Sequence, residues 1–438
     1  MEPWVLAVIL FGALMLFIAF GLPIAFTMGG LATFFTLWFW GLKGTYMIVT
    51  TSFGELTHFV LIAVPLYIYM GIILEKTGMA DDLYETVYRW FGGIKGGLAI
   101  GTVIICALFA AMVGTSSAAT VTMGLIALPS MLKRGYSKVL VTGAISAGGA
   151  LGILIPPSVI MVLYSSVTEV SVGKMYAGGM IPGILLSLLF IAYIYIRCAI
   201  NPNLGPPIPK ERRFTLIEKV VCLKGVIFPL VLIVIVLGTI YAGICTPTES
   251  AGIGCIGSLI CCAINKRLTW ANLKSSALRT IHLNSIVMWI MVGAVAFSHA
   301  FIVSGAGDAV KEAVVGLQLN RWIILWITQI IFMILGCFID PAGIMMICCP
   351  VFVPIIIALG FDPLWFGILF TINMEMAYIT PPFGYNLFYM RAIVPPEISM
   401  GDIYRSIVPF LFCQVVCLAL VIIFPELALW FPNKLIVK

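Results

Sequence analysis

The chain has 438 residues, of which 62% are hydrophobic and only 10% are charged, and its mean hydropathy is +1.15. A soluble domain carries about 25% charged residues, so this composition excludes an ordinary water-soluble protein. The net charge of +6 does not indicate nucleic-acid binding, because the basic residues gather in short connections between apolar segments. We therefore expect the lipid bilayer to surround the chain, and no nucleic-acid partner.

Apolar segments long enough to cross a bilayer, at ~17–25 residues per helix, recur from one end of the chain to the other. Examples are Trp4–Phe20, Val226–Tyr241 and Phe410–Phe424. The first of them has no basic region or small-residue cleavage site before it, so we expect a retained span and not a signal peptide. The pattern predicts one all-α polytopic membrane unit.

In chain order, we predict N-terminal scaffold helices in residues 1–50 and a first repeat in 51–200, with a hairpin at 98–131 and a broken helix at 139–167. A cytoplasmic linker at 201–224 follows. The second repeat covers 225–430, with a hairpin at 322–357 and a broken helix at 364–390.

Twelve cysteines are present, but they show neither zinc-ligand spacing nor a CxxC pair. They lie inside apolar runs, so we expect free, buried thiols, among them Cys106, Cys222, Cys255, Cys261, Cys262, Cys348, Cys349, Cys413 and Cys417. No metal site other than a sodium site is predicted.

An internal repeat appears when the sequence is shifted by 225 positions. Pro129 then falls on Pro354, Gly135 on Gly360, Pro156-Pro157 on Pro381-Pro382, and Tyr164 on Tyr389. A shift of 227 also aligns Gly78 and Asp81 with Gly305 and Asp308. A coincidence of abundant glycine and proline is the alternative explanation, but a doubled proline at one shared offset disfavours it.

The charges predict that the two repeats have opposite orientation in the membrane. The polar linker carries Lys210, Arg212, Arg213 and Lys219, which places it in the cytoplasm together with the basic loop at 133–138. The repeat partner of that loop, Ala358–Pro363, has no basic residue and is expected outside, as are both termini. Inverted-topology repeats are typical of secondary transporters.

Each half contains two interruptions of its apolar sequence. Irregular backbone within a membrane is tolerated only where it is buried in protein or lines a cavity. Gly114-Thr115-Ser116-Ser117 and Asp340-Pro341-Ala342-Gly343 are expected at the tips of re-entrant hairpins that enter from opposite sides. The structural alternative for the first is a small-residue patch for helix packing.

The second kind of interruption is the double proline in Gly152–Ser158 and in Tyr378–Gly384. Proline has no N–H and its ring clashes with the carbonyl four residues earlier, so two prolines leave carbonyl oxygens unpaired. Na⁺ takes hard oxygen ligands of this kind, together with the hydroxyls of Ser116, Ser117, Ser158 or Thr380. The half-helices that begin after the breaks direct their N-termini at the same region, which favours an anionic substrate. A kink that serves only packing is the alternative.

Ionisable residues within membrane segments are functional candidates by default. Asp340 lies at the outer hairpin tip. Glu375, five residues before Thr380, is a candidate cation or proton ligand; a structural bond to Asn373 or to a helix end is equally open. His58, His282 and His299 are scattered singly, and no catalytic constellation emerges.

Five segments together make the chain similar to a known family: GTSSAATVTMG at 114–124, LPSMLKRGYS at 128–137, GGALGILIPPSVIMVLYS at 148–165, VGKMYAGGMIPGIL at 172–185 and NMEMAYITPPFGYNLFYM at 373–390. They resemble the large membrane subunit of the tripartite ATP-independent periplasmic (TRAP) transporters. The resemblance spans nearly the whole chain. It implies a sodium-coupled elevator carrier in the bacterial inner membrane, with Na⁺ as the coupling ion and no cofactor.

The resemblance also implies partners and sites. The partners are a small four-helix membrane subunit, a soluble periplasmic substrate-binding protein and a small carboxylate substrate. One sodium site is expected between the inner tip and the first break, and the other between the outer tip and the second break. The implied sodium ligands are Gly114, Ser116, Ser117, Gly152, Pro156, Asp340, Gly343, Thr380, Pro381 and Gly384. The substrate is expected between the tips, with Thr115, Ser158, Asn373, Glu375 and Asn386 as candidate ligands.

The sequence departs from the common family pattern at Ala377-Tyr378, where many members have a glycine followed by a small or aliphatic residue. A stand-alone sodium- or proton-coupled dicarboxylate or citrate carrier of the same superfamily is the alternative within transport. An intramembrane enzyme is disfavoured, because no motif places a histidine beside Ser116 or Ser117, and no phosphate-binding G-x-x-x-x-G-K-[ST] loop is present.

Overall fold

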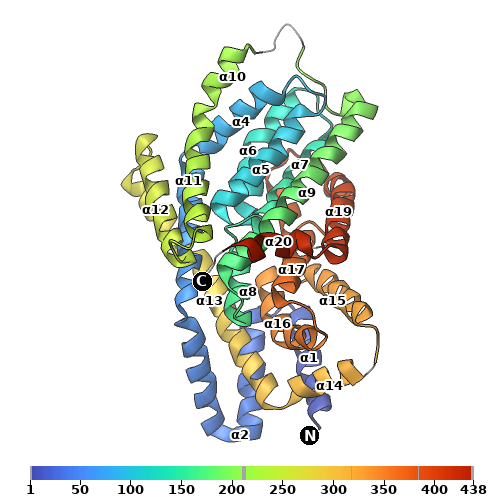
Figure 1. Ribbon diagram of the computed structural model, residues 1–438. Coiled ribbons are helices and arrows are strands. Elements are labelled where there is room, and N and C mark those ends of the chain that lie inside the picture. Colours follow the sequence, from blue (N-terminus) through green and yellow to red (C-terminus); the bar gives the residue numbers. More distant parts are fainter. Residues whose placement is uncertain (1, 210–213, 317, 383, 436–438) are drawn as a thin grey trace.

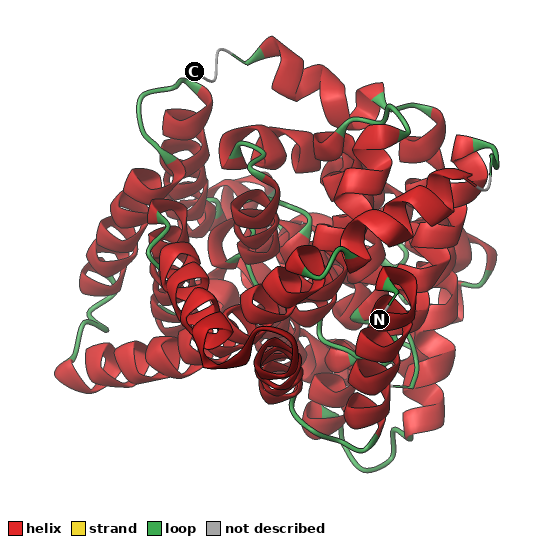
Figure 2. Cartoon of the chain, turned by 90° about the horizontal axis from the view of Figure 1, so that it is seen from below, coloured by secondary structure: helices red, strands yellow, loops and turns green. Residues whose placement is uncertain are grey.

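The computed structural model describes residues 2–209, 214–316, 318–382 and 384–435, and all regular structure in these ranges is helical (Figure 2). The α-helices are α1 (Pro3–Ala19), α2 (Ile24–Leu56), α3 (Ala63–Lys76), α4 (Met79–Phe91), α5 (Gly97–Val113), α6 (Ser116–Lys133), α7 (Lys138–Ala150), α8 (Val159–Thr168), α9 (Val172–Ile200), α10 (Leu216–Cys222), α11 (Lys224–Tyr241), α12 (Pro247–Ile264), α13 (Trp270–Val303), α14 (Ala306–Gly316), α15 (Arg321–Gly336), α16 (Pro341–Ala358), α17 (Pro363–Ala377), α18 (Tyr385–Ile393), α19 (Met400–Ile423) and α20 (Glu426–Lys434). Short 3₁₀ turns are η1 (Phe59–Ile62), η2 (Leu151–Ile153) and η3 (Pro202–Leu204).

Eight helical segments in the described ranges are long and apolar enough to cross a membrane. Several of them keep large hydrophobic side chains on the outside, such as Trp38 at 72% and Val234 at 67% exposure. Such surface is unfavourable in water and favourable against lipid tails, which agrees with the predicted polytopic membrane protein.

The helix boundaries repeat with the shift that the sequence predicts. Residues 116–133 of α6, moved by 225 positions, become 341–358, which are the bounds of α16. The same shift takes α5 onto α15, α7 onto α17, α8 onto α18 and α9 onto α19 to within three residues at each helix end. In Figure 1, α5 and α6 lie in the upper half of the molecule, whereas α15 and α16 lie in the lower half. The predicted inverted-topology architecture is confirmed.

The two repeats interlock at their centre. The second arm of the first hairpin, α6, packs against α18 of the second repeat. The second arm of the other hairpin, α16, packs against α8 of the first repeat. Each hairpin therefore packs against the half-helix that follows the proline break of the opposite repeat.

Helices α2, α3, α12 and α13 pack together, with α2 and α3 against α13 and α12 against α3, and α13 also contacts α16. Gly41 interrupts α2 with a φ of +65°, which a residue with a side chain adopts with difficulty. The predicted boundary at residue 50 falls within the second part of this helix. The Arg279 guanidinium pairs with Glu75 at 3.1 Å, and Lys76 donates to Ser275, so both contacts join α3 to α13.

The predicted linker is only partly described, since Lys210, Arg212 and Arg213 lie outside the described residues. Lys219 lies in the short helix α10, which a capping box between Thr215 and Glu218 begins. All twelve cysteines are free, as expected, but Cys222, Cys245 and Cys337 are half-buried. The expectation of uniform burial is wrong at these positions, because each lies at or beyond the end of a helix, where fewer neighbours cover it.

The orientation of the two repeats gives a direct prediction. A cysteine at Ser137, between α6 and α7, and one at Ala358, at the end of α16, should react with a membrane-impermeant maleimide from opposite sides of the membrane. Labelling of the unsubstituted protein provides the background to subtract. Reaction of both positions from the same side would contradict the inverted topology.

Candidate functional site

The first hairpin turns at two residues. Gly114 ends α5 in a left-handed conformation with a φ of +65°, and Thr115 is extended before α6 begins at Ser116. A Cβ at Gly114 would lie 2.6 Å from the Pro157 carbonyl oxygen. A glycine is therefore required here both by the backbone angle and by the close approach of the first proline break.

The first proline break separates α7 from α8. Helix α7 ends at Ala150, the turn η2 follows, and the Pro156-Pro157 bond is cis. Ser158 caps α8, since its Oγ accepts from the Met161 N–H at 3.5 Å and donates to the Ile153 carbonyl at 2.6 Å. Among the described residues, no donor reaches the carbonyl oxygens of residues 155–157. These oxygens are available to a cation.

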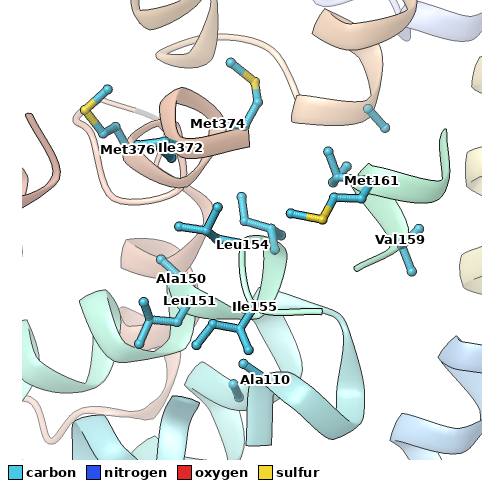
Figure 3. Close-up of a cluster of buried hydrophobic side chains, with 14 of the residues drawn as sticks. Ala110, Ala150, Leu151, Leu154, Ile155, Val159, Met161, Ile372, Met374 and Met376 are labelled. Carbon is cyan, nitrogen blue, oxygen red and sulfur yellow. The ribbon is translucent and has the colours of Figure 1, made fainter. Parts of the chain in front are cut away.

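The break and the hairpin tip are in backbone contact. A Cβ at Gly152 would lie 2.8 Å from the Thr115 carbonyl oxygen and 3.2 Å from the Ser116 nitrogen. Apolar side chains lie around the break: the cluster of buried hydrophobic side chains in Figure 3 includes Leu154 and Ile155 of the break, Ala110 of α5, and Met374 and Met376 of α17, with Ile155 near Ala110. This shell keeps water from the free carbonyl oxygens, which strengthens their interaction with an ion.

A hydrogen-bonded chain joins the tip to the other repeat. The Ser116 hydroxyl donates to Asn386 Oδ1 at 2.9 Å, and Asn386 Nδ2 donates to the Ser146 carbonyl at 3.0 Å. Because the Ser116 proton is used in this bond, its lone pairs remain free to bind a cation. The buried hydroxyls of Ser146 and Thr120 have no partner among the described residues.

The second hairpin begins α16 with an acidic cap. The Asp340 carboxylate accepts from the Ala342 N–H at 2.9 Å, and Pro341 is the first residue of the helix. Asp340 also lies within electrostatic range of the hydroxyls of Tyr378 and Tyr385 beside the second break. The hairpin thus presents a carboxyl group to the second break, whereas the first hairpin tip presents hydroxyl and backbone groups alone.

The second proline break closes on itself more tightly than the first. The Thr380 hydroxyl donates to the Met376 carbonyl at 2.7 Å, and the Gly384 N–H donates to the Thr380 carbonyl at 2.9 Å. A Cβ at Gly384 would lie 3.0 Å from three backbone atoms of residues 379–380. The Pro381-Pro382 bond is cis, and the Tyr404 hydroxyl donates to the Pro382 carbonyl at 3.3 Å.

Ala377 and Gly343, near the second break and the second tip, both lie against neighbouring helices. Ala377 packs against Gly336 of α15, where an added Cβ would lie only 2.4 Å from the Ala377 side chain. An atom at the Cβ position of Gly343 would meet the Ile24 side chain of α2 at 3.1 Å. Gly343 therefore lies against the beginning of α2.

The predicted ligands fall into three groups by location: those at the second tip and break, described above, those around the first tip, and two in α17. Gly114, Thr115, Ser116, Gly152 and Asn386 are linked around the first tip, while Ser117 is half-buried in the first turn of α6. Asn373 and Glu375 lie near the C-terminal end of α17, before the second proline break. Asn373 donates to the Gln329 carbonyl at 2.8 Å, and Glu375 faces Gln414 of α19. Neither of these two residues makes a described hydrogen bond to a hairpin tip.

The sequence alone did not single out Ser146, Thr120 and Gln414 as residues with buried polar groups near the predicted site residues. Ser146 and Thr120 lie in small-residue runs that are typical of helix packing, and Gln414 is a single polar residue in an apolar span. Only the fold shows that their polar atoms are buried beside the two breaks or beside Glu375. No group of three or more His, Cys, Asp or Glu side chains lies together in the described part of the chain.

The chain matches a family model described as "Tripartite ATP-independent periplasmic transporter, DctM component" over residues 11–427. It is 34% identical over 379 residues to the C4-dicarboxylate TRAP transporter large permease protein DctM of Pseudomonas aeruginosa, covering 86% of this chain and 87% of that protein. It is 32% identical over 376 residues to the ectoine TRAP transporter large permease protein TeaC of Halomonas elongata, covering 84% and 85%.

A solved structure shares the fold. The Alcanivorax borkumensis YdaH transporter, whose crystal structure is described as having an unusual topology, matches with a TM-score of 0.64 over 98% of each chain. The two sequences are only 15% identical, so the likeness concerns the fold alone.

The contact between the first tip and the first break gives a prediction. Gly152→Ala should push the Thr115–Ser116 backbone away by several tenths of an ångström, because both contacts in the way are backbone atoms. We expect the rise in thermal unfolding midpoint that sodium gives the purified protein to shrink. Gly252→Ala is the control, since nothing lies within 4 Å of its added Cβ. A full sodium response in Gly152→Ala would show that the break is not part of a sodium site.

Proposed function

The chain belongs to the family of the DctM component of tripartite ATP-independent periplasmic transporters, and from this premise we propose that it is the large permease subunit of a sodium-coupled carrier. The carrier imports a small organic acid anion through the bacterial inner membrane by an elevator motion. The chain supplies the ion sites and the path for the substrate, and it is not an enzyme.

One observation carries this proposal most strongly. Two helix breaks related by the repeat each lie beside a hairpin, the first fully buried and the second partly exposed at Pro381 and Pro382. Each combines backbone carbonyls with a hydroxyl whose proton is already donated elsewhere. Neutral oxygens in a dry site suit a monovalent cation, since Na⁺ is a hard ion that binds carbonyl and hydroxyl oxygens. A divalent cation would require more carboxylates than the described residues provide here.

We assign the first sodium to Gly114, Ser116, Ser117, Gly152 and Pro156. The second is assigned to the Asp340 and Gly343 end of the other hairpin together with Thr380, Pro381 and Gly384. The Asp340 carboxylate makes the second site the more negative of the two, so we expect it to bind sodium more tightly.

The substrate lies between the hairpin tips in this proposal. Helices α6, α8, α16 and α18 all begin at the tips or the breaks, and each N-terminus carries about half a positive charge. Together with the bound sodium ions they offset the charge of an anion. Thr115, Asn386 and Ser158 are the proposed contacts at the first tip, since Ser158 Cα lies 3.9 Å from the Cβ position of Gly114, and Asn373 and Glu375 remain predictions further from it.

Two partners complete the carrier in this proposal. A soluble periplasmic protein captures the substrate, and a small four-helix membrane subunit packs against the apolar outside of the large chain. The named substrates of the relatives differ, a C4-dicarboxylate in one and ectoine in another, so the binding protein is the place to identify the substrate. Both termini of the large chain are proposed to lie in the periplasm.

The coupling ion is tested in proteoliposomes that hold the complete complex. The substrate is first identified by the thermal shift that a panel of carboxylates gives the binding protein. Uptake should then follow an imposed inward sodium gradient and need no ATP. Equal uptake with choline in place of sodium would exclude sodium coupling, and uptake by the large chain alone would favour a stand-alone carrier.

Thr380→Val tests the second site. Valine keeps the shape and branching of threonine but removes the oxygen, and a lost interaction of this kind costs about 1–3 kcal/mol. The sodium concentration for half-maximal uptake should therefore rise about five- to 150-fold.

Thr371→Val is a closely matched control. Its hydroxyl donates to the Gly367 carbonyl at 2.8 Å, four residues back on the same helix, in the same way that Thr380 bonds to Met376. Both residues are buried, and only Thr380 lies at the break. If the two variants show the same sodium dependence as the wild type, the Thr380 hydroxyl serves packing alone.

A further inference from the structure

Glu375 is a buried acid with no described counter-charge. It lies on α17, its side chain is fully buried, and neither carboxyl oxygen has a hydrogen-bond partner in the described part of the chain. The three ion pairs in the described residues all lie elsewhere. An ionised carboxylate in such surroundings is very unfavourable, so the group must take up either a proton or a metal cation.

The polar group that faces Glu375 is the amide of Gln414 on α19. Gln414 is also fully buried, and neither its Oε1 nor its Nε2 has a hydrogen-bond partner among the described residues. Gln414 and Glu375 thus lie near each other across the contact between α17 and α19, each with unpaired polar atoms.

The neighbouring titratable groups do not supply a positive charge. Cys417, one turn after Gln414, is the titratable side chain that interacts with Glu375, and its thiol donates to the Pro182 carbonyl of α9 at 3.7 Å. None of the other titratable side chains on α19 or on the elements packed against α17 is a described partner of Glu375. They are Asp402, Tyr404, Arg405 and Cys413 of α19; Tyr164 of α8; Lys174, Tyr176, Tyr193, Tyr195, Arg197 and Cys198 of α9; Arg321 of α15; Cys348 and Cys349 of α16; and Glu426 and Lys434 of α20.

Hydrogen-bond chemistry distinguishes the two ways of neutralising Glu375. A protonated carboxyl has one donor and one free acceptor, which complement the acceptor and the donor of an amide, so all four atoms are satisfied at once. A sodium ion at the carboxylate would need several more oxygen ligands, and the Gln414 amide is the one polar side chain described beside Glu375. The pair therefore suits a proton better than a metal cation.

We propose that Glu375 and Gln414 form a proton-binding site, in which a neutral Glu375 carboxyl pairs with the Gln414 amide and joins α17, just before its proline break, to α19. The proton comes from water and returns to water, and no other bond is made or broken. This site is separate from the two proposed sodium sites and does not depend on them.

Infrared spectroscopy of the purified large chain with its small subunit tests the proposal, because a protonated carboxyl has a C=O stretch well separated from those of carboxylates. At neutral pH the wild type should show such a band, and ¹³C labelling of the glutamate side-chain carboxyls should shift it. Glu375→Gln should remove the band, whereas Glu85→Gln should leave it, since Glu85 is a half-exposed partner of Arg89. Exchanging choline for sodium should not change it.

Gln414→Leu provides a second measurement that keeps Glu375. Loss of the amide partner should move the band to higher frequency, as expected for a carboxyl that has lost a hydrogen bond. Absence of a glutamate band in the wild type, or its persistence in Glu375→Gln, would overturn the proposal. A band that sodium abolishes in the wild type would show that Glu375 binds the metal ion instead.

Discussion

The arrangement depends on one constraint: inside a membrane, every backbone polar group must find a partner within the protein or on a bound ion. Continuous helices meet this constraint automatically, whereas the two hairpin tips and two proline breaks do not. At the first break the carbonyls of residues 155–157 have no described donor, although the surrounding residues are buried. A bound cation satisfies such carbonyls, and this requirement connects the broken helices to ion binding.

The interlocking of the repeats follows from the same constraint. A hairpin tip buried in lipid would expose its own backbone, so each tip needs protein on all sides. Helix α6 finds it on α18, and α16 finds it on α8. Asn386 makes this contact specific at the first site, because its amide binds Ser116 of one hairpin arm and the Ser146 carbonyl of α7 at the same time. A conformational change at one break therefore acts on the hairpin of the other repeat.

The sequence predicted the parts of this architecture that depend on backbone chemistry. Repeated prolines and glycines have few structural meanings, so the shift of 225 positions located both hairpins and both breaks, and the bounds of α6 and α16 follow it without error. Contacts between side chains distant in sequence were not predictable. Three features depend on how each helix is rotated about its axis. They are the bond from Ser116 to Asn386, the contact of Gly343 with Ile24, and the different partners of Asn373 and Glu375. Assigning the family's functional roles to matching positions of this sequence gives no information about that rotation.

The central claim is that the two breaks hold sodium, and an electron cryomicroscopy map of the complete complex in sodium tests it most directly. The account predicts density for an ion within coordination distance of the Ser116 hydroxyl and the carbonyls of residues 155–157, and for another beside Asp340 and Thr380, with both absent when choline replaces sodium. Breaks without ion density in sodium, with every carbonyl bonded to a protein donor, would contradict it.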